Sequence, residues 1–295
     1  MSNVPSISIV GPGKVGTAIG VLAVRAGLNV VAVGGRVAAA TARAAEAIAG
    51  RSRAMTVTES AGAGELVLLC VNDDAIEVVC SRLAAAGAFR RGAIVAHCSG
   101  ALGSDVLQAA ADKCGCAVGS FHPLQTFPTV EAAIERLAGA YCFCEGDERA
   151  TAVLAELARA IGAEAVMLPS AGKALYHAAG VMACNYVTTL MDAAIELCER
   201  AGIERDTARA ALGVLLAATA DNAAAMDPAD ALTGPIARGD AGTVRRHLEA
   251  LASCPADVQA LYRAAGERTV GLALRKGTID SDTAETLRSI FKSAL

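Results

Sequence analysis

The sequence has no surplus of positive charge. Its 295 residues include 26 Lys and Arg against 30 Asp and Glu, which gives a formal net charge of −4. A chain of this charge offers no large basic surface to phosphate polymers or to anionic membranes. We therefore expect neither a nucleic acid nor a membrane among its partners.

Long apolar runs are also missing, although hydrophobic residues make up 54% of the chain. No uncharged apolar stretch reaches the roughly 20 residues that span a bilayer. The longest, residues 178–191, is interrupted by Asn185 and two threonines. The N-terminus lacks a basic region followed by an unbroken apolar stretch, because its first apolar run meets glycines and Lys14 at once. These absences predict a cytoplasmic protein.

Cysteine is too sparse for a disulfide scaffold. There are 10 cysteines in 295 residues, well below the density of disulfide-rich domains. Two Cys-x-Cys pairs, Cys114/Cys116 and Cys142/Cys144, lack the wider spacing and nearby histidines of zinc sites. We expect reduced thiols packed as small apolar side chains, and no metal.

The first 168 residues alternate short β-branched apolar runs with Ala-rich helical stretches. This pattern is typical of an α/β fold, a doubly wound, mostly parallel sheet of the Rossmann type with helices on both faces. The predicted strands are Ser6–Val10, Asn29–Val33, Leu66–Val71, Ile94–His97, Ala117–Phe121, Ala140–Cys144 and Ala165–Leu168.

After Pro169 the strand pattern ends, and apolar residues recur at helical spacing. We therefore predict two domains, residues 1–168 and an all-helical domain of residues 169–295. Its first helix, from about Ala171 to Ala201, would be roughly 45 Å long at 1.5 Å per residue.

A glycine-rich loop joins the first predicted strand to the first predicted helix. Gly11-x-Gly13-x-x-Gly16 in this position is the dinucleotide-binding pattern in its required context. Gly11 permits the tight turn, Gly13 permits close approach of a pyrophosphate, and Gly16 permits close packing of helix and strand. Lys14 and Val15 complete the loop. The alternative is a glycine turn that binds nothing.

The end of the second strand distinguishes the two nicotinamide cofactors. An acid there binds the ribose 2′-hydroxyl of NAD, whereas an arginine accommodates the 2′-phosphate of NADP. The chain has Gly34-Gly35-Arg36 and no acid at this point. We therefore expect NADP, with Arg36 at its phosphate; a solvated surface arginine is the alternative.

Polar residues follow three later strands: Asn72 and Asp73, then His97 and Ser99, then His122. Ligands of open parallel sheets collect outside the carboxyl ends of the strands. We expect Asn72, Asp73 and His97 to contact the cofactor. Ser99 and His122 would then contact the substrate. For each histidine alone, a hydrogen bond that stabilises a loop is an equally good interpretation.

The predicted long helix opens with residues suited to proton transfer. Ser170 is a candidate N-cap, which places Lys173 in the first turn and His177 one turn later on the same face. The helix dipole and burial beside a cofactor would lower the pKa of Lys173 toward neutrality. Asn185 lies about 80° further round the helix and joins the site only if the helix bends near Gly180. An exposed lysine at a helix start is the alternative.

The glycine loop and the long helix that opens with Lys173 resemble the 6-phosphogluconate dehydrogenase C-terminal-like group. This group includes β-hydroxyacid dehydrogenases and ketopantoate reductases. Four motifs are more closely similar to an uncharacterised family that joins a Rossmann-like domain to a helical domain of unknown function, whose members are labelled NADP-dependent or deazaflavin-dependent oxidoreductases. The motifs are His97-x-Ser99-Gly100, residues 121–127 (FHPLQTF), Lys173-x-x-Tyr176-His177 and residues 232–240 (LTGPIARGD). The resemblance covers essentially the whole chain.

The resemblance implies an NADPH-dependent reductase of a small carbonyl or imine compound, with ketopantoate as the first candidate. In the wider group a helix lysine, here Lys173, protonates the substrate carbonyl, and an asparagine lies four residues later where this chain has His177. The loop that contains Arg238 would line the substrate site, and Asp240 would cap the next helix. Homodimers are usual in the group.

Two other functions remain compatible with the sequence. A sensor that binds NADP without catalysis would keep the Rossmann domain but need no ionisable pair at the domain junction. An NADP:deazaflavin oxidoreductase would need a second large cofactor pocket.

Overall fold

The computed structural model describes residues 4–293, and the chain divides after Asn185 into two compact units. Each unit has its own hydrophobic core. The sequence predicted a boundary at residue 169, where the strand pattern ends. The compact division lies later because side chains of the first helix after that point contact the sheet of the first unit.

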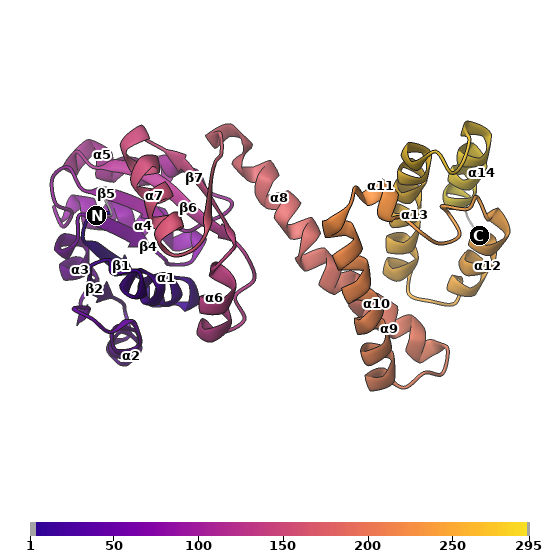
Figure 1. Ribbon diagram of the computed structural model, residues 1–295, viewed down its shortest axis with the longest axis horizontal. Helices are drawn as coiled ribbons and strands as arrows, with labels where there is room; N and C mark the ends of the chain where they lie inside the picture. The colour runs from indigo at the N-terminus through magenta and orange to yellow at the C-terminus, as the bar shows by residue number, and fades with distance from the viewer. Residues whose placement is uncertain (1–3, 294–295) are drawn as a thin grey trace. The chain divides into compact units, whose positions relative to one another are not determined.

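The first unit is built on an eight-stranded sheet with the order β3-β2-β1-β4-β5-β6-β7-β8 (Figure 1). All neighbouring strands are parallel except β6 and β7. The predicted mostly parallel, doubly wound sheet is therefore confirmed. The strands are β1 (Ile7–Val10), β2 (Val30–Gly34), β3 (Arg53–Met55), β4 (Leu66–Leu69), β5 (Ile94–His97), β6 (Ala117–Leu124), β7 (Tyr141–Gly146) and β8 (Glu164–Met167).

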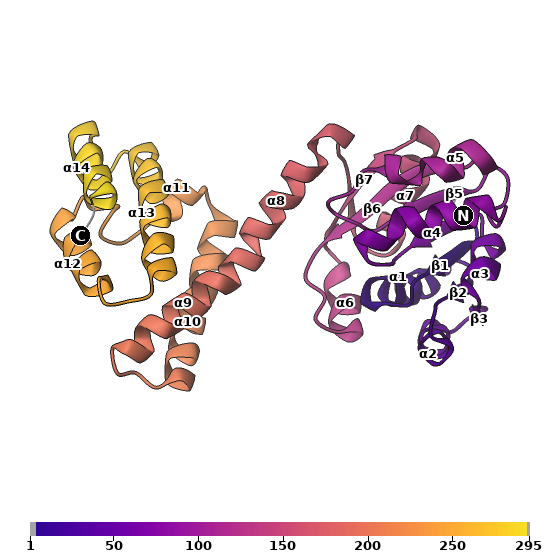
Figure 2. The same ribbon diagram turned by 180° about the vertical axis from the view of Figure 1, so that it is seen from behind.

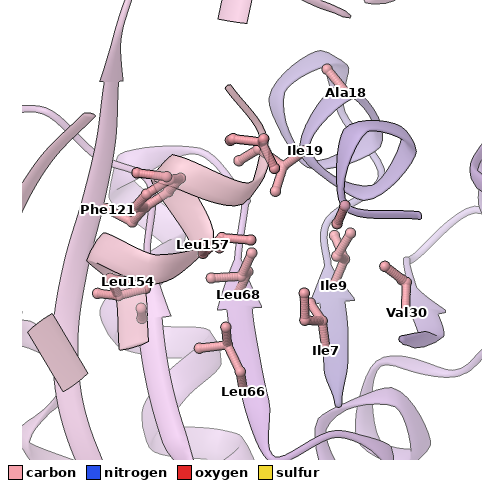
Figure 3. Close-up of a cluster of buried hydrophobic side chains, with 14 of the residues drawn as sticks. Ile7, Ile9, Ala18, Ile19, Val30, Leu66, Leu68, Phe121, Leu154 and Leu157 are labelled. Atoms are coloured by element: carbon pink, nitrogen blue, oxygen red, sulfur yellow. The ribbon is translucent and has the colours of Figure 1, made fainter. Parts of the chain in front are cut away.

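Helices cover both faces of this sheet because its central strands are apolar on both sides. Ile7, Ile9, Leu66 and Leu68 point to one face and pack with Leu154 and other helix residues (Figure 3). That face is covered by α1 (Lys14–Arg25), α2 (Ala38–Ile48), α6 (Val130–Leu137) and α7 (Glu148–Ala160). The opposite face is covered by α3 (Val57–Ala63), α4 (Asp73–Ala85), the 3-10 helix η1 (Ser104–Leu107) and α5 (Gln108–Cys114).

Strand ends shift by one or two residues elsewhere, and two strands differ more from the sequence-based expectation. β3 was not predicted, because Arg53–Met55 is a three-residue edge strand that is largely exposed and has no apolar pattern. β6 was expected to end at Phe121 but continues through Leu124, since its last three residues pair with the start of β7. His122 therefore lies within a strand and not in the loop after it.

The predicted long helix is present with one interruption. The 3-10 helix η2 (Ser170–Gly172) leads into α8 (Lys173–Ala183), and α9 (Asn185–Arg200) follows after Cys184, whose φ and ψ of −124° and −71° leave the helical region. By length and composition alone, Ser170–Arg200 could cross a membrane, and only 6% of its most apolar window is buried. A single helix of this kind is weak evidence for a membrane segment.

Between residues 170 and 293 the regular structure is entirely helical, as predicted. The second unit contains α10 (Arg205–Ala225), α11 (Pro228–Ala231), α12 (Ala241–Leu251), α13 (Ala256–Lys276) and α14 (Ser281–Lys292) (Figure 2). Val244, Leu248, Val270 and Leu287 are central to its core. The predicted cap is confirmed, since the Asp240 carboxylate accepts the Thr243 N–H at 2.9 Å at the start of α12.

Candidate functional site

A cavity of about 520 Å³ opens at the carboxyl ends of β1 and β4, where the strand order reverses. The glycine loop (residues 11–13) and the β2–α2 loop (residues 35–37) line it, together with one face of α4. In doubly wound sheets this crevice is the usual place for a dinucleotide. The cavity is therefore the candidate cofactor site.

Two glycines of the loop, Gly11 and Gly16, are required by their surroundings. Gly11 has a φ of 101°, and a Cβ there would lie 2.7 Å from the Cys70 carbonyl. A Cβ on Gly16 would lie 3.0 Å from the Cys70 and Ile9 side chains, so glycine is what lets α1 pack this closely on β1. Gly13 is exposed, and the nearest atom to its Cβ position is the Cys70 carbonyl oxygen at 4.0 Å. The loop thus presents open backbone at the N-terminus of α1, which fits a pyrophosphate.

The predicted cofactor residues that line the cavity are Gly11, Gly13, Arg36 and Asn72. Gly16 is buried beneath the loop, and Val15 is half-buried against the core. Lys14 is exposed as the first residue of α1. The direct contacts of Lys14 and Val15 with a cofactor stay predictions.

His97 is fully buried at the end of β5. Its Nε2 lies 2.9 Å from the Gly103 carbonyl oxygen, and its Nδ1 accepts the Ser99 N–H at 3.1 Å. Burial lowers the pKa of His97, which keeps the ring neutral near pH 7. Because both nitrogens are used within the loop after β5, the structure supports the loop-stabilising interpretation of His97 over a cofactor contact.

Ser99 connects this loop to the next strand end. Its hydroxyl donates to the Asp73 carboxylate at 2.8 Å and accepts the Ala101 and Leu102 N–H groups. Ser99 is 5% exposed, so its hydroxyl is committed to the loop in this structure. Asp73 and Ser99 therefore come together, as expected, but as partners of one another.

Lys173 lies in the first turn of α8, as predicted, and is the first residue of that helix. It is only 2% exposed, so the alternative of an exposed lysine is wrong. Its ammonium donates to the Ser120 hydroxyl and lies 3.5 Å from the carboxylate of Glu145 on β7. Glu145, also buried, accepts the Ser104 N–H at 2.7 Å and hydroxyl donations from Ser104 and Ser170 at 2.9 and 2.7 Å. The prediction that Ser170 caps α8 is wrong, because its hydroxyl donates to Glu145 instead.

The surroundings of this buried ion pair shift the pKa values of both Lys173 and Glu145. Burial lowers the pKa of Lys173 more than the Glu145 carboxylate raises it. Burial alone would raise the pKa of Glu145, but the hydrogen bonds from Ser170 and Ser104 and the charge of Lys173 hold it below its usual value. The carboxylate therefore stays ionised, and Lys173 releases a proton more readily than an exposed lysine.

A second cluster lies one turn further along α8. His122 Nδ1 is 2.8 Å from the Tyr176 hydroxyl, and the His122 and His177 rings meet edge to face at 6.0 Å between centroids. A Cβ on Gly100 would lie 2.6 Å from the His177 ring and 2.7 Å from His122 Nε2, so glycine at this position admits both rings. Burial, followed by the nearby charge of Lys173, lowers the pKa of His122 to about 4. His122 is therefore neutral at pH 7 and can accept or pass on a proton.

The cysteines pack as expected. Cys142 and Cys144 are buried in the core on one face of the sheet, and burial raises the pKa of both thiols. Cys70 and Cys98 follow β4 and β5 with their sulfurs 3.5 Å apart as free thiols. Within residues 4–293 no cluster of three or more potential ligands is placed to bind a metal.

The two remaining predicted substrate residues are both exposed. Asn185 is exposed as the first residue of α9. Arg238 is exposed in the second unit, in the loop before α12. Their contacts with a substrate stay predictions.

Three residues of these sites were missed from the sequence. Glu145 lies near the end of the apolar strand β7. Its position as the lone carboxylate directly after an apolar run could have identified it from the sequence. Tyr176 is part of the recognised helix motif but was given no role. Arg82 lines the dinucleotide cavity from α4 and carries no motif.

Two family models match the chain. A Rossmann-like domain covers residues 3–123, and a domain of unknown function, DUF2520, covers residues 140–269. The ion pair lies within the second match, whereas Ser120 and His122 lie within the first. The polar clusters on α8 therefore join the two matched regions. Comparison with curated proteins found no significant match.

Solved structures with the same fold span nearly the whole chain. A protein from Bacteroides fragilis described as a candidate NADP oxidoreductase is 22% identical, with 90% of this chain and 97% of that chain covered and a TM-score of 0.69. A Thermotoga maritima protein is 23% identical, with coverages of 97% and 98% and a TM-score of 0.65. An imine reductase from a Pseudomonas species is 19% identical, with coverages of 98% and 99% and a TM-score of 0.61. At these identities the likeness shows a shared fold.

Proposed function

We propose that this pairing of a Rossmann-like domain with a DUF2520 domain forms an NADPH-dependent reductase of a small compound with a C=O or C=N bond. The cavity at the reversal point of the sheet carries the proposal, because the glycine loop, an α-helix N-terminus and Arg36 line or adjoin one space. The names of two structural neighbours, a candidate NADP oxidoreductase and an imine reductase, support the same class of reaction.

The residues present fit NADP. Gly13 leaves open backbone for the pyrophosphate, and the cavity wall near Arg36 includes Val37, Ala40 and Val78, which suit an adenine ring. Arg36 replaces the acid that a ribose 2′-hydroxyl would require. When bound, NADPH supplies the hydride, and the protein supplies orientation, a proton and exclusion of water.

The proton has two candidate donors on α8. Lys173 is the donor implied by family resemblance, but direct transfer from it requires the buried pair with Glu145 to open. The Tyr176 hydroxyl is half-buried and hydrogen-bonded to His122. It can donate its proton to the developing substrate anion, and the neutral imidazole can then pass its N–H proton to the Tyr176 oxygen while its other nitrogen takes a proton from solvent. Burial raises the pKa of Tyr176, which keeps the hydroxyl protonated. We therefore assign proton transfer to Tyr176 with His122, substrate orientation to His177, and positioning of α8 to Lys173.

The substrate panel follows from this chemistry. Ketopantoate leads the 2-oxo acids, and cyclic imines represent the C=N compounds. The assay follows NADPH absorbance with the wild type, Tyr176→Phe and Lys173→Met, with NADH in parallel. The expected result is oxidation of NADPH by one compound and a loss of about 100-fold in kcat for Tyr176→Phe, within the usual range for a positioned acid.

Other outcomes would replace the proposal. Tight NADPH binding with no turnover on any compound supports a sensor. Recovery of a deazaflavin from the purified protein supports hydride transfer between two cofactors. An unchanged kcat for Tyr176→Phe with a collapse for Lys173→Met, measured under conditions where both variants are fully folded, identifies Lys173 as the proton donor.

We also propose a homodimer. Large apolar side chains are exposed on two consecutive helices of the second unit: Tyr186 and Leu190 on α9, and Val214 and Leu215 on α10. A second copy that covers these helices would bury them. Light scattering with size-exclusion chromatography is expected to give twice the chain mass, and Val214→Glu is expected to shift it toward one chain mass. A wild-type monomer at micromolar concentration would contradict the proposal.

A further inference from the structure

Two arginines from different elements line the dinucleotide cavity. Arg36 lies in the loop after β2, and Arg82 lies in the third turn of α4. Both are exposed. Arg36 follows β2, where sequence patterns place the residue that binds the cofactor ribose. No such pattern explains why Arg82 lines the same cavity.

One face of α4 forms a wall of the cavity. Ala75, Val78, Val79 and Arg82 all line it, and their spacing of three and four residues places them on one side of the helix. At 1.5 Å per residue this wall is about 10 Å long. Side chains on a helix lean toward its N-terminus. The Arg82 side chain therefore extends back along the wall toward the carboxyl edge of the sheet, the edge from which Arg36 projects.

Positive charge is in excess among the residues that line this cavity. Within residues 4–293, neither Arg36 nor Arg82 has a hydrogen-bond acceptor or an ion-pair partner. The acid that lines the cavity is Asp74, in the first turn of α4 and eight residues before Arg82, about 12 Å along the helix. Two guanidinium groups that face one space repel each other unless an anion lies between them.

We propose that Arg82 is the second arm of a phosphate clamp, in which Arg36 and Arg82 together hold the phosphate monoester on the adenosine ribose of the cofactor. This inference rests on the proposed function. A phosphate monoester carries a charge of about −1.5 to −2 at pH 7 and offers three acceptor oxygens, more than one guanidinium can pair. A ribose hydroxyl in the same place would leave both cations without a counter-ion. The clamp thus selects the phosphorylated dinucleotide from two sides.

The test measures binding without any turnover. Isothermal titration calorimetry of the full-length protein compares adenosine 2′,5′-bisphosphate with adenosine 5′-monophosphate, which lacks the second phosphate. Arg82→Ala and Arg36→Ala are each expected to weaken the bisphosphate about 10- to 100-fold, the range for a charge-assisted hydrogen-bonded pair. Both are expected to change the monophosphate less than about 3-fold. Arg91→Ala removes the same charge from an exposed position outside the cavity and is expected to change neither ligand.

The double variant tests whether the two arginines hold the same phosphate. Groups that share one partner give non-additive losses. Arg36→Ala/Arg82→Ala is therefore expected to lose less than the product of the two single losses. Arg82→Lys keeps the charge without the planar fork and is expected to recover part of the affinity.

The outcomes separate this inference from the function beneath it. Wild-type protein that prefers the bisphosphate, with Arg82→Ala unchanged, overturns the clamp and leaves the NADPH site in place. Equal weakening of both ligands by Arg82→Ala also overturns it, because Arg82 would then serve the adenine or the fold. Wild-type protein that binds neither adenosine ligand nor NADPH overturns the cofactor site itself.

Discussion

The Glu145–Lys173 pair gives the most demanding prediction about stability. Both side chains are buried, and each is within hydrogen-bonding distance of polar partners. Glu145→Gln keeps the shape and leaves an unpaired ammonium in the core, which costs about 3–5 kcal/mol of folding free energy. Lys173→Met leaves a carboxylate that still accepts three hydrogen bonds, so we expect a smaller loss of roughly 1–3 kcal/mol.

The double variant Glu145→Gln/Lys173→Met removes both charges. We expect its loss to be smaller than the sum of the single losses by about 2 kcal/mol or more, because no unpaired ion remains. The assay is urea unfolding of the full chain, followed by circular dichroism. Additive single losses, or single losses under about 0.5 kcal/mol, would refute a buried ion pair.

The stability of Glu145→Gln should also change with pH in a direction that the ion pair determines. Without the carboxylate, the folded pKa of Lys173 falls further below its unfolded value. The unfolded chain then binds more protons than the folded chain, so stability rises with pH, by up to about 1.4 kcal/mol per pH unit, until the unfolded lysine titrates. The wild type is expected to show a shallower rise between pH 7 and 9. A variant with the wild-type slope would contradict the assigned partner.

Three further perturbations have defined outcomes. Folding lowers the pKa of His122 from 6.5 to about 4, so the folded chain binds fewer protons than the unfolded chain between these pH values. The free energy of unfolding should therefore fall by up to about 3 kcal/mol between pH 6.5 and pH 4. Urea titrations of His122→Gln should lack this part of the pH dependence. In α13, Gly266→Ala would place a Cβ against the Phe291 ring and should lower the melting temperature, whereas Gly271→Ala has open space and should raise it by a few degrees. Asp240→Ala removes the cap of α12 and should cost about 1 kcal/mol; no change would mean that its hydrogen bond adds nothing.

Periodicity and turn residues were sufficient to predict the fold class and the glycine loop, because both depend on patterns within short stretches of sequence. The spacing of Gly11 and Gly16 is visible in the sequence itself, although the atoms that require glycine there come largely from Cys70, which follows β4. β3 could not be predicted, since Arg53–Met55 forms a strand only by pairing with β2 at the sheet edge.

The candidate site depended on pairings that no local pattern contains. Lys173 was identified, but its partner Glu145 lies 28 residues earlier on a strand whose apolar run ended one residue before it. Burial then changed the interpretation of Lys173 from a direct proton donor to a positioning residue. Arg82 shares a cavity with Arg36 only because α4 packs beside the carboxyl end of β1. Such contacts belong to tertiary structure.

Equilibrium binding of NADPH and NADH tests the central claim most directly. NADPH fluorescence is titrated with wild-type protein and with Gly13→Leu, which fills the open space over the glycine loop. The account predicts micromolar or tighter binding of NADPH, binding of NADH at least about 10-fold weaker, and loss of both in Gly13→Leu. Failure of the wild type to bind NADPH, or equal binding of the two nucleotides, would contradict it.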